Sequence, residues 1–332
     1  MVLEPLELSD ARPAPSRSRD ARRMTLLVAV AAVCIAVFLT IGVTGNWDFI
    51  LPRRLTTVAT MSVVAVAIAI STVLFHTITA NRILTPSIMG FDSLYLLIQT
   101  AGVFVIGSSA MNNVDTLVRF ALEALLMVGM SVVLYRWLLL DTRRSLHLLV
   151  LVGVIIGTML RSLSSLLQRI MSPEEFIVVQ DAFFADFTGA EPRLLAIGGV
   201  LILACVAIVW RLRRELDVLA LGRDTSVGLG VDHRALTMRL LVLIAILVAV
   251  ATALVGPTTF FGLLVAHLAY QFFSSQKHAV IVPAASLCAL IALIGGQVVF
   301  ERILGFQGSL SMVVEFLGGI VFIVLLLRRA SA

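Results

Sequence analysis

Charged residues are scarce in this chain of 332 residues: Asp, Glu, Lys and Arg make up 14% of it, against about 25% in typical soluble domains. Hydrophobic residues make up 60%, and the mean hydropathy is +1.05. This composition excludes both a soluble globular enzyme and a disordered chain. The apolar runs are continuous rather than alternating, which disfavours a transmembrane β-barrel.

Residues that could carry chemistry are also few. The three cysteines lie in apolar runs and form neither a disulfide framework nor a CxxC metal site. No GxxxxGK[ST], HExxH or GxSxG motif is present, so we expect no catalytic residues, no metal site and no cofactor on this chain. Each histidine stands without a clustered partner in the sequence and is expected to be structural. The five are His76, His147, His233, His267 and His278.

What the chain does contain is a series of apolar runs of about 20 residues, the length needed to cross a bilayer. We therefore predict an all-α polytopic membrane protein with about ten transmembrane helices. Residues 1–24 are polar and basic and are expected to form a disordered cytosolic tail before one permease domain over 25–329. A signal peptide is the alternative for the first run. The expected spans are 25–45, 56–78, 88–108, 117–138, 147–169, 193–212, 239–256, 259–274, 279–298 and 310–327.

The basic residues predict the orientation of these spans. With the N-terminus inside, 18 of the 25 Lys and Arg residues fall on the cytoplasmic side, six fall outside, and Arg161 lies within a span. Cytoplasmic loops of membrane proteins carry an excess of such residues. Both termini are therefore expected in the cytoplasm, and the net charge of +5 indicates this bias rather than nucleic-acid binding.

Two connections are longer than simple loops require. The outer one carries apolar residues among acids, which predicts a short helix at about 173–190. The inner one, at about 213–238, has apolar residues at helical spacing around Gly222, Gly228 and Gly230, which predicts two short helices with a glycine joint. Its apolar face either lies on the membrane lipid or fits a groove on a soluble partner, such as a separate ATPase.

Ionisable residues inside a membrane are costly and often mark pathways. Arg161 lies in the fifth span beside Ser162 and Ser165, and Glu123 of the fourth span could face it. Either these residues form a structural interhelical pair, or they line a polar translocation path that attracts an anionic solute.

Four blocks in order resemble one family. The segment Leu219 to Val231 (LALGRDTSVGLGV) is similar to the family segment LALGEETARSLGV, and Val255 to His267 (VGPTTFFGLLVAH) is similar to AGPIGFVGLIVPH. Leu84 to Gly90 is similar to NPLADPGLLG, and Leu51-Pro-Arg is similar to an LPR that opens the second span. These blocks resemble the FecCD-type permeases of ABC importers for iron siderophores and vitamin B12. The resemblance covers about 45–329.

The resemblance implies the type II ABC importer permease architecture: a second permease copy or a homologous permease, two ABC ATPase subunits that hold ATP and Mg, and an extracytoplasmic substrate-binding protein. It places ATPase coupling in the inner loop and docking of the binding protein on the outer face, and it implies that the helix at 173–190 is an outer gate. The coupling residues would be Leu219, Leu221, Gly222, Arg223, Asp224, Ser226, Gly228 and Gly230. The docking residues would be Arg53, Arg54, Glu301 and Arg302.

The chain departs from the family pattern at some positions: Ala266 replaces a common Pro, and Ser309 and Ser311 replace a common Pro-Ile-Gly. Glu301-Arg302 and the VEFLGG segment at 314–319 resemble the ferric-siderophore branch, including catecholate importers of the anguibactin, enterobactin and petrobactin sort. We therefore expect import of a ferric siderophore across the bacterial cytoplasmic membrane. The alternatives are vitamin B12, haem or a metal ion as substrate, an ion-coupled secondary transporter, or a membrane-embedded enzyme.

Overall fold

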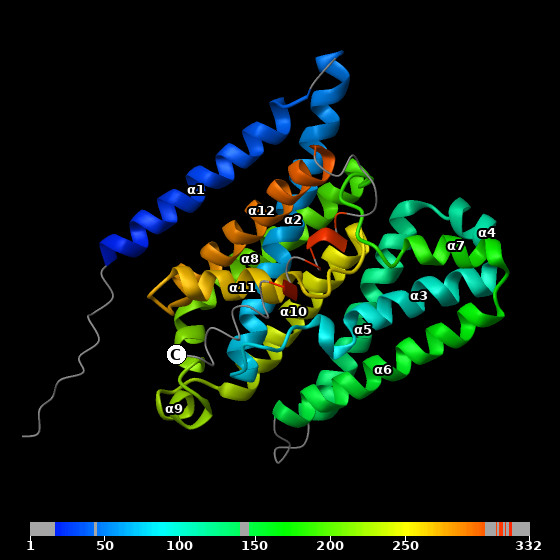
Figure 1. Ribbon diagram of the computed structural model, residues 1–332. Helices are drawn as coiled ribbons and strands as arrows, with labels where there is room; N and C mark the ends of the chain where they lie inside the picture. Colours follow the sequence, from blue (N-terminus) through cyan, green and yellow to red (C-terminus); the bar gives the residue numbers. More distant parts are fainter. Residues whose placement is uncertain are drawn as a thin grey trace, which may run out of the picture.

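The computed structural model describes residues 17–42, 45–139 and 146–302 and, near the C-terminus, residues 310, 312–314, 316, 319 and 320. Every element in this part of the chain is a helix (Figure 1). The longer helices are α1 (Arg17–Thr40), α2 (Trp47–Thr79), α3 (Phe91–Ile106), α5 (Thr116–Leu139), α6 (Leu146–Ile170), α8 (Pro192–Leu219), α10 (His233–Val255), α11 (Phe261–Phe272) and α12 (His278–Arg302). The short ones are η1 (Ser87–Met89), α4 (Ser108–Asn113), α7 (Pro173–Asp181) and α9 (Arg223–Gly228).

Helices therefore occupy nine of the ten stretches expected to span the membrane, and most of the tenth, 310–327, lies outside the described residues. Within the described ranges, seven helices are long and apolar enough to cross a bilayer. Helices α3 and α11 have 16 and 12 residues, which is about 24 and 18 Å at 1.5 Å per residue. Both are shorter than the roughly 30 Å of hydrocarbon, so neither is among the seven helices long enough to cross a bilayer.

The core is built around α2 and α10. In the most apolar window of each helix, 72% and 67% of the residues are buried, whereas α1, α5, α6 and α8 have between 17% and 22% buried. Helix α2 packs on α12, α10, α8 and α11, and α10 also packs on α5 and α8. An apolar helix that is buried on all sides belongs inside a bundle, while the exposed apolar faces of the outer helices suit lipid.

The bundle has two distinct ends. Figure 1 places α9 at one end and both α7 and the α1–α2 junction far from it. With 33 residues, about 50 Å long, α2 is longer than the hydrocarbon layer is thick. Its first turns project at the α7 end, where Trp47 and Phe49 are exposed. Aromatic side chains in such a position suit the membrane–water interface.

The break expected at Gly256-Pro257 is present, because α10 ends at Val255 and α11 begins at Phe261. Gly256 has φ +98°, a conformation that favours glycine, and its N–H donates to the Thr252 carbonyl at 2.7 Å. The expected tight hairpin of α10 with α11 does not form, however. After the irregular residues 256–260, helix α11 packs on α12 and α2 instead.

Two helix boundaries lie outside the apolar runs. Helix α1 begins at Arg17, inside the stretch expected to be a disordered tail, and the Asp20 carboxylate accepts from the N–H groups of Ser274 and Ser275 at 3.2 and 3.0 Å. Helix α8 continues to Leu219 rather than ending near 212. Its added residues include Arg, Glu and Leu, which are good helix formers that hydropathy does not register as part of a span.

Helices α3 and α6 pack together, and a pair of glycines lies where the start of α3 meets α6. A Cβ atom on Gly157 of α6 would lie 2.7 Å from the Cα and 3.2 Å from the N of Gly90, which precedes α3. Both neighbours are backbone atoms, which cannot rotate away. The close approach of these backbones positions the polar face of α6, described below.

We predict that Gly157→Ala destabilises the protein by about 1–3 kcal/mol, the usual cost of overpacking. The measurement is the melting temperature of the detergent-solubilised chain. Gly129→Ala on α5 is the matched control, because a Cβ at Gly129 meets nothing within 4 Å. A Gly157→Ala chain that melts at or above the parent temperature would contradict the close packing described here.

Candidate functional site

The inner connection expected at 213–238 is shorter than predicted and forms a compact projection, here called the α9 knob (residues 220–232). Gly222, with φ +97°, starts α9, and Gly230, with φ +84°, turns the chain back toward α10. Asp232 then caps α10 by accepting from the N–H groups of Arg234 and Ala235. Glycines therefore mark both ends of α9, and Gly228 is its last helical residue. The prediction of two short helices is wrong, because the first part of the connection continues α8 and α9 is the one short helix between α8 and α10.

Ser226 holds the α9 knob together from inside. Its side chain is fully buried, its hydroxyl donates to the Arg223 carbonyl at 2.8 Å and contacts Nδ1 of His233 at 3.2 Å. Its own carbonyl accepts from the Val231 N–H at 3.0 Å. Ser226 thus fixes the shape of the knob and offers no surface to a partner.

The outer face of the α9 knob is apolar with a charged edge. Leu221, Val227 and Leu229 are 60%, 56% and 61% exposed, and Arg223 and Asp224 are exposed beside them. Leu219, expected to be a contact with a partner, is only 3% exposed because it packs into the core at the end of α8. The structure therefore corrects the expected set: Leu221 can meet a partner and Leu219 cannot.

At the opposite end, two of the expected docking arginines cap a helix. The guanidinium groups of Arg54 and Arg302 both donate to the Ile41 carbonyl, at 2.9 and 2.6 Å, just beyond the last residue of α1. Arg54 also donates to the Phe38 carbonyl. Cations favour the carbonyl end of a helix, so these two side chains have a structural role that sequence spacing did not indicate.

The other two residues of that set have different surroundings. The side chain of Arg53 is exposed, nearly two turns from the start of the projecting α2. Glu301 is half-buried and accepts from the Gln297 side chain at 2.8 Å, one turn earlier on α12. Arg53 and Arg302 are both exposed at this end of the bundle, but the guanidinium group of Arg302 is bonded to the Ile41 carbonyl.

Glu123 does not face Arg161, contrary to expectation. It is 3% exposed and forms an ion pair with Arg119 at 2.9 Å, one turn away on α5. The Gln99 side chain closes a triangle: its nitrogen donates to Glu123 at 2.7 Å and its oxygen accepts from Arg119 at 2.6 Å. A buried carboxylate satisfied in this way holds α3 to α5 rather than lining a path.

Arg161 is exposed on the surface of α6, although it lies in the middle of a span. The same open hollow is bordered by polar residues at helical spacing on both sides of Arg161, namely Thr158 before it and Ser162, Ser165 and Arg169 after it. This polar face also opens into a cavity of about 250 Å³. The cavity is lined by Asp92, Leu96, Arg161, Ser164, Ser165, Gln168, Phe183, Phe184, Pro257 and Thr259.

A charged face at this depth cannot be left against lipid without a large cost, so water or another protein surface must cover it. Thr100, Ser164 and Gln168 behind it are joined by hydrogen bonds of 2.8 to 3.2 Å, which fix α6 against α3. The arrangement can therefore bind a passing solute weakly with Arg161, Ser162 and Ser165 while the helix itself stays in position.

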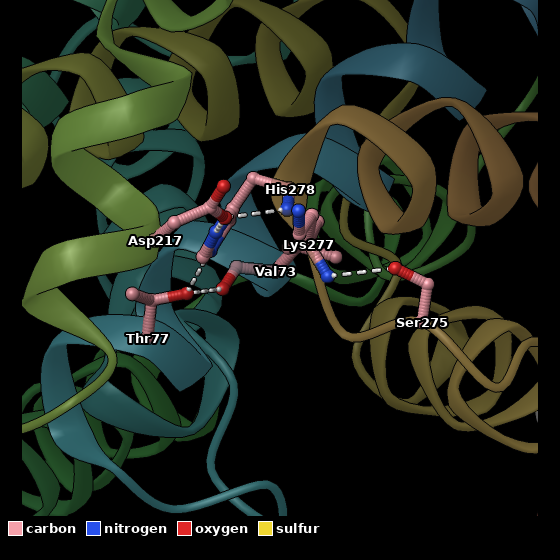
Figure 2. A network of polar contacts seen from close by, with 6 residues as sticks. All are labelled: Val73, Thr77, Asp217, Ser275, Lys277 and His278. Atoms are coloured by element: carbon pink, nitrogen blue, oxygen red, sulfur yellow. Dashed lines mark hydrogen bonds and ion pairs between the residues drawn. The ribbon is translucent and has the colours of Figure 1, made fainter. Parts of the chain in front are cut away.

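Sequence reasoning missed two groups of residues that come from distant segments. The rings of His76 and His267 lie 6.1 Å apart, with Tyr270 beside both. His278 bonds Asp217 and Thr77 near the α9 knob (Figure 2). The chain separations of 61 to 201 residues explain why no local motif indicated these contacts. Within the described ranges, no three His, Cys, Asp or Glu side chains come together as a metal site.

Comparison with known proteins identifies the family of this helical bundle. The model of the FecCD transport family matches residues 24–328. The chain belongs to this family. It is a multi-pass membrane protein and a transport permease.

Three similar proteins place the chain more closely within the FecCD family. The petrobactin import system permease protein YclO of Bacillus subtilis is 44% identical over 94% of this chain and 98% of its own length. The petrobactin import system permease protein FatC of Bacillus anthracis is 37% identical over 85% and 80%. A metal-chelate type ABC transporter solved in an inward-facing conformation has a TM-score of 0.82 at 22% identity, over 93% and 99% of the two chains, which shows a shared fold.

The helix-capping role of the arginines leads to a prediction about α1. Arg302→Gln should expose the last turn of α1, so backbone amides near Ile41 exchange hydrogen about tenfold faster, which is roughly 1.4 kcal/mol of local stability. Hydrogen exchange followed by mass spectrometry in detergent measures this change. Arg53→Gln is the control and should leave exchange unaltered. Equal exchange in the parent and Arg302→Gln chains would show that Arg302 does not cap α1.

Proposed function

We propose that this chain is the permease subunit of an ATP-driven importer that moves a ferric siderophore, delivered by a substrate-binding protein, into the cytoplasm. The observation that carries the proposal is the α9 knob, an apolar surface displayed on a chain that has no nucleotide-binding loop. Similarity to two petrobactin import permeases over most of their length supports the siderophore as cargo.

The proposed orientation has ten spans, with both termini and the α9 knob in the cytoplasm of a bacterium. Basic residues gather around the α9 end, including Arg213, Arg214, Arg223 and Arg234, and the excess of Lys and Arg in cytoplasmic loops supports this choice. The start of α1 lies at the same end, because Asp20 bonds the 273–277 connection that precedes α12.

In this orientation the α9 knob seats in a groove on one of two ABC ATPase subunits. Leu221, Val227 and Leu229 supply the apolar anchors, and Arg223 and Asp224 supply polar contacts at the edge. Helical segments bind grooves through such spaced apolar anchors. ATP and Mg belong to the ATPase subunits, and this chain receives their movement through the α9 knob.

The polar face of α6 is proposed to line the translocation path, completed by a second permease copy or a homologous permease. Covering the face in this way removes Arg161 from lipid, which supports a dimer around that face. Ferric siderophores are often anionic, and the chelator already fills the coordination shell of the iron. The path therefore needs a cationic, weakly binding wall, which Arg161 and the nearby hydroxyls provide.

The binding protein is proposed to dock outside, where Arg53 is displayed at the projecting end of α2. Carboxylates on that protein would pair with Arg53, and steering by exposed charges weakens as salt rises. The structural roles of Arg54 and Arg302 reduce the expected docking set to Arg53, with Glu301 nearby on the adjacent helix end.

The proposal predicts that the double variant Val227→Asp, Leu229→Asp inserts normally but fails to retain the ATPase subunits, because burying two carboxylates in an apolar groove is strongly unfavourable. Co-purification of the ATPase and ATP-dependent uptake of ferric petrobactin are the readouts, and both should fall by at least about tenfold. The matched control is Glu215→Gln, which changes an exposed acid on α8 outside the α9 knob and should retain both the ATPase and the uptake. Normal uptake in the double variant would show that the α9 knob is not the surface that binds the ATPase.

A further inference from the structure

Three transmembrane helices meet at one buried imidazole next to the α9 knob. Asp217 lies in the last turn of α8, His278 is the first residue of α12, and Thr77 lies in the last turn of α2 (Figure 2). The Asp217 carboxylate accepts from the backbone N–H of His278 at 2.8 Å and contacts the ring Nδ1 at 2.7 Å. The other ring nitrogen, Nε2, lies 2.7 Å from the Thr77 hydroxyl.

The hydrogen bonds of this group depend on one another. The Thr77 hydroxyl lies 2.9 Å from the Val73 carbonyl, to which it donates its single hydrogen. Both ring nitrogens of the buried His278 therefore have a polar partner, the Asp217 carboxylate at Nδ1 and the Thr77 hydroxyl at Nε2. His278 is 5% exposed, so loss of either partner leaves a buried polar group unpaired.

The position of the group connects the α9 knob to the core. Asp217 is the last acidic residue of α8 and lies within one helical turn of the α9 knob. The other partners belong to α2, the most buried helix, and to α12, which packs along it. At the far end the same two helices are tied together through Arg54 and Arg302, which both bond Ile41.

We infer that Asp217, His278 and Thr77 form the link that transmits movement of the α9 knob to α2 and α12 and so couples ATP hydrolysis to transport. The inference rests on the proposed function, since it requires an ATPase acting on the α9 knob. The three are positioning residues: none lines the path of the solute. A contact that only stabilised the fold would change the amount of active protein, whereas this link sets how much ATP is used per molecule transported.

The test compares ATP hydrolysed with ferric petrobactin imported, in proteoliposomes that contain the full complex of this chain with its ATPase subunits and binding protein. Asp217→Ala should raise the ATP used per imported molecule by about fivefold or more, within the range of coupling between sites. Glu215→Ala, an exposed acid two residues earlier on α8, is the matched control and should leave the ratio unchanged. Asp217→Asn keeps an acceptor oxygen and should restore much of the coupling.

Thr77→Val provides a second, nearly isosteric variant that keeps the test decisive if Asp217→Ala fails to insert. It should raise the same ratio, and the combined variant should be no worse than Asp217→Ala alone, because both changes break one link. A ratio equal to that of the parent in Asp217→Ala and Thr77→Val would overturn the inference. A parent complex that shows no ATP-dependent uptake would instead overturn the proposed function, so the two failures are distinguishable.

Discussion

The packing of α2 inside the bundle is the constraint on which the other features depend. Helix α2 contacts α8, α10, α11 and α12, and its central window is the most buried in the described chain. Because its length exceeds the hydrocarbon thickness, its two ends project into different environments. One end carries the exposed Arg53, and the other carries Thr77 beside His278. A displacement at one end of α2 is therefore transmitted to its other end, since a closely packed core has low compressibility and transmits strain.

The chemistry of the chain is divided in a way that suits a passive transport subunit. Charges that are fully satisfied, such as Glu123 with Arg119 and Gln99, hold helices together. The charge that is displayed at membrane depth, Arg161, lies on a hydroxyl-rich face beside a cavity. The apolar surface displayed at the end of the bundle, on the α9 knob, suits a protein partner. In the proposed importer, the satisfied charges belong to the scaffold, the face around Arg161 lines the translocation path, and the α9 knob couples the chain to the ATPase.

The helices and the α9 knob could be predicted from the sequence because their signals are local. Apolar runs fix where a chain can cross a membrane, and Gly222, Gly230 and Gly256 mark turns that need positive φ. Helix ends were less predictable: α1 and α8 continue beyond their apolar runs, because charged residues that end a hydropathy signal are still good helix formers.

The candidate site was predictable only where exposure follows from local pattern. Leu221 and Leu219 look alike in the sequence, yet the first is 60% exposed and the second 3%, because packing at the end of α8 decides between them. The capping of α1 by Arg302 could not be predicted from the sequence, since Arg302 lies 261 residues from its acceptor at Ile41. Glu123 pairs with Arg119, one turn away on its own helix, rather than with a residue across the bundle. The four-residue spacing in the sequence favours this pair but does not determine it.

In the proposed function, conformational change in a separate ATPase drives transport of the solute through this chain. Identifying the energy source of uptake tests this proposal most directly. Proteoliposomes that hold the chain with its ATPase subunits and binding protein can be supplied with ferric petrobactin, internal ATP and a protonophore in turn. The account predicts uptake that requires ATP and the ATPase subunits and continues when the protonophore abolishes the proton gradient. Uptake by this chain alone that follows an ion gradient and ends with the protonophore would contradict it.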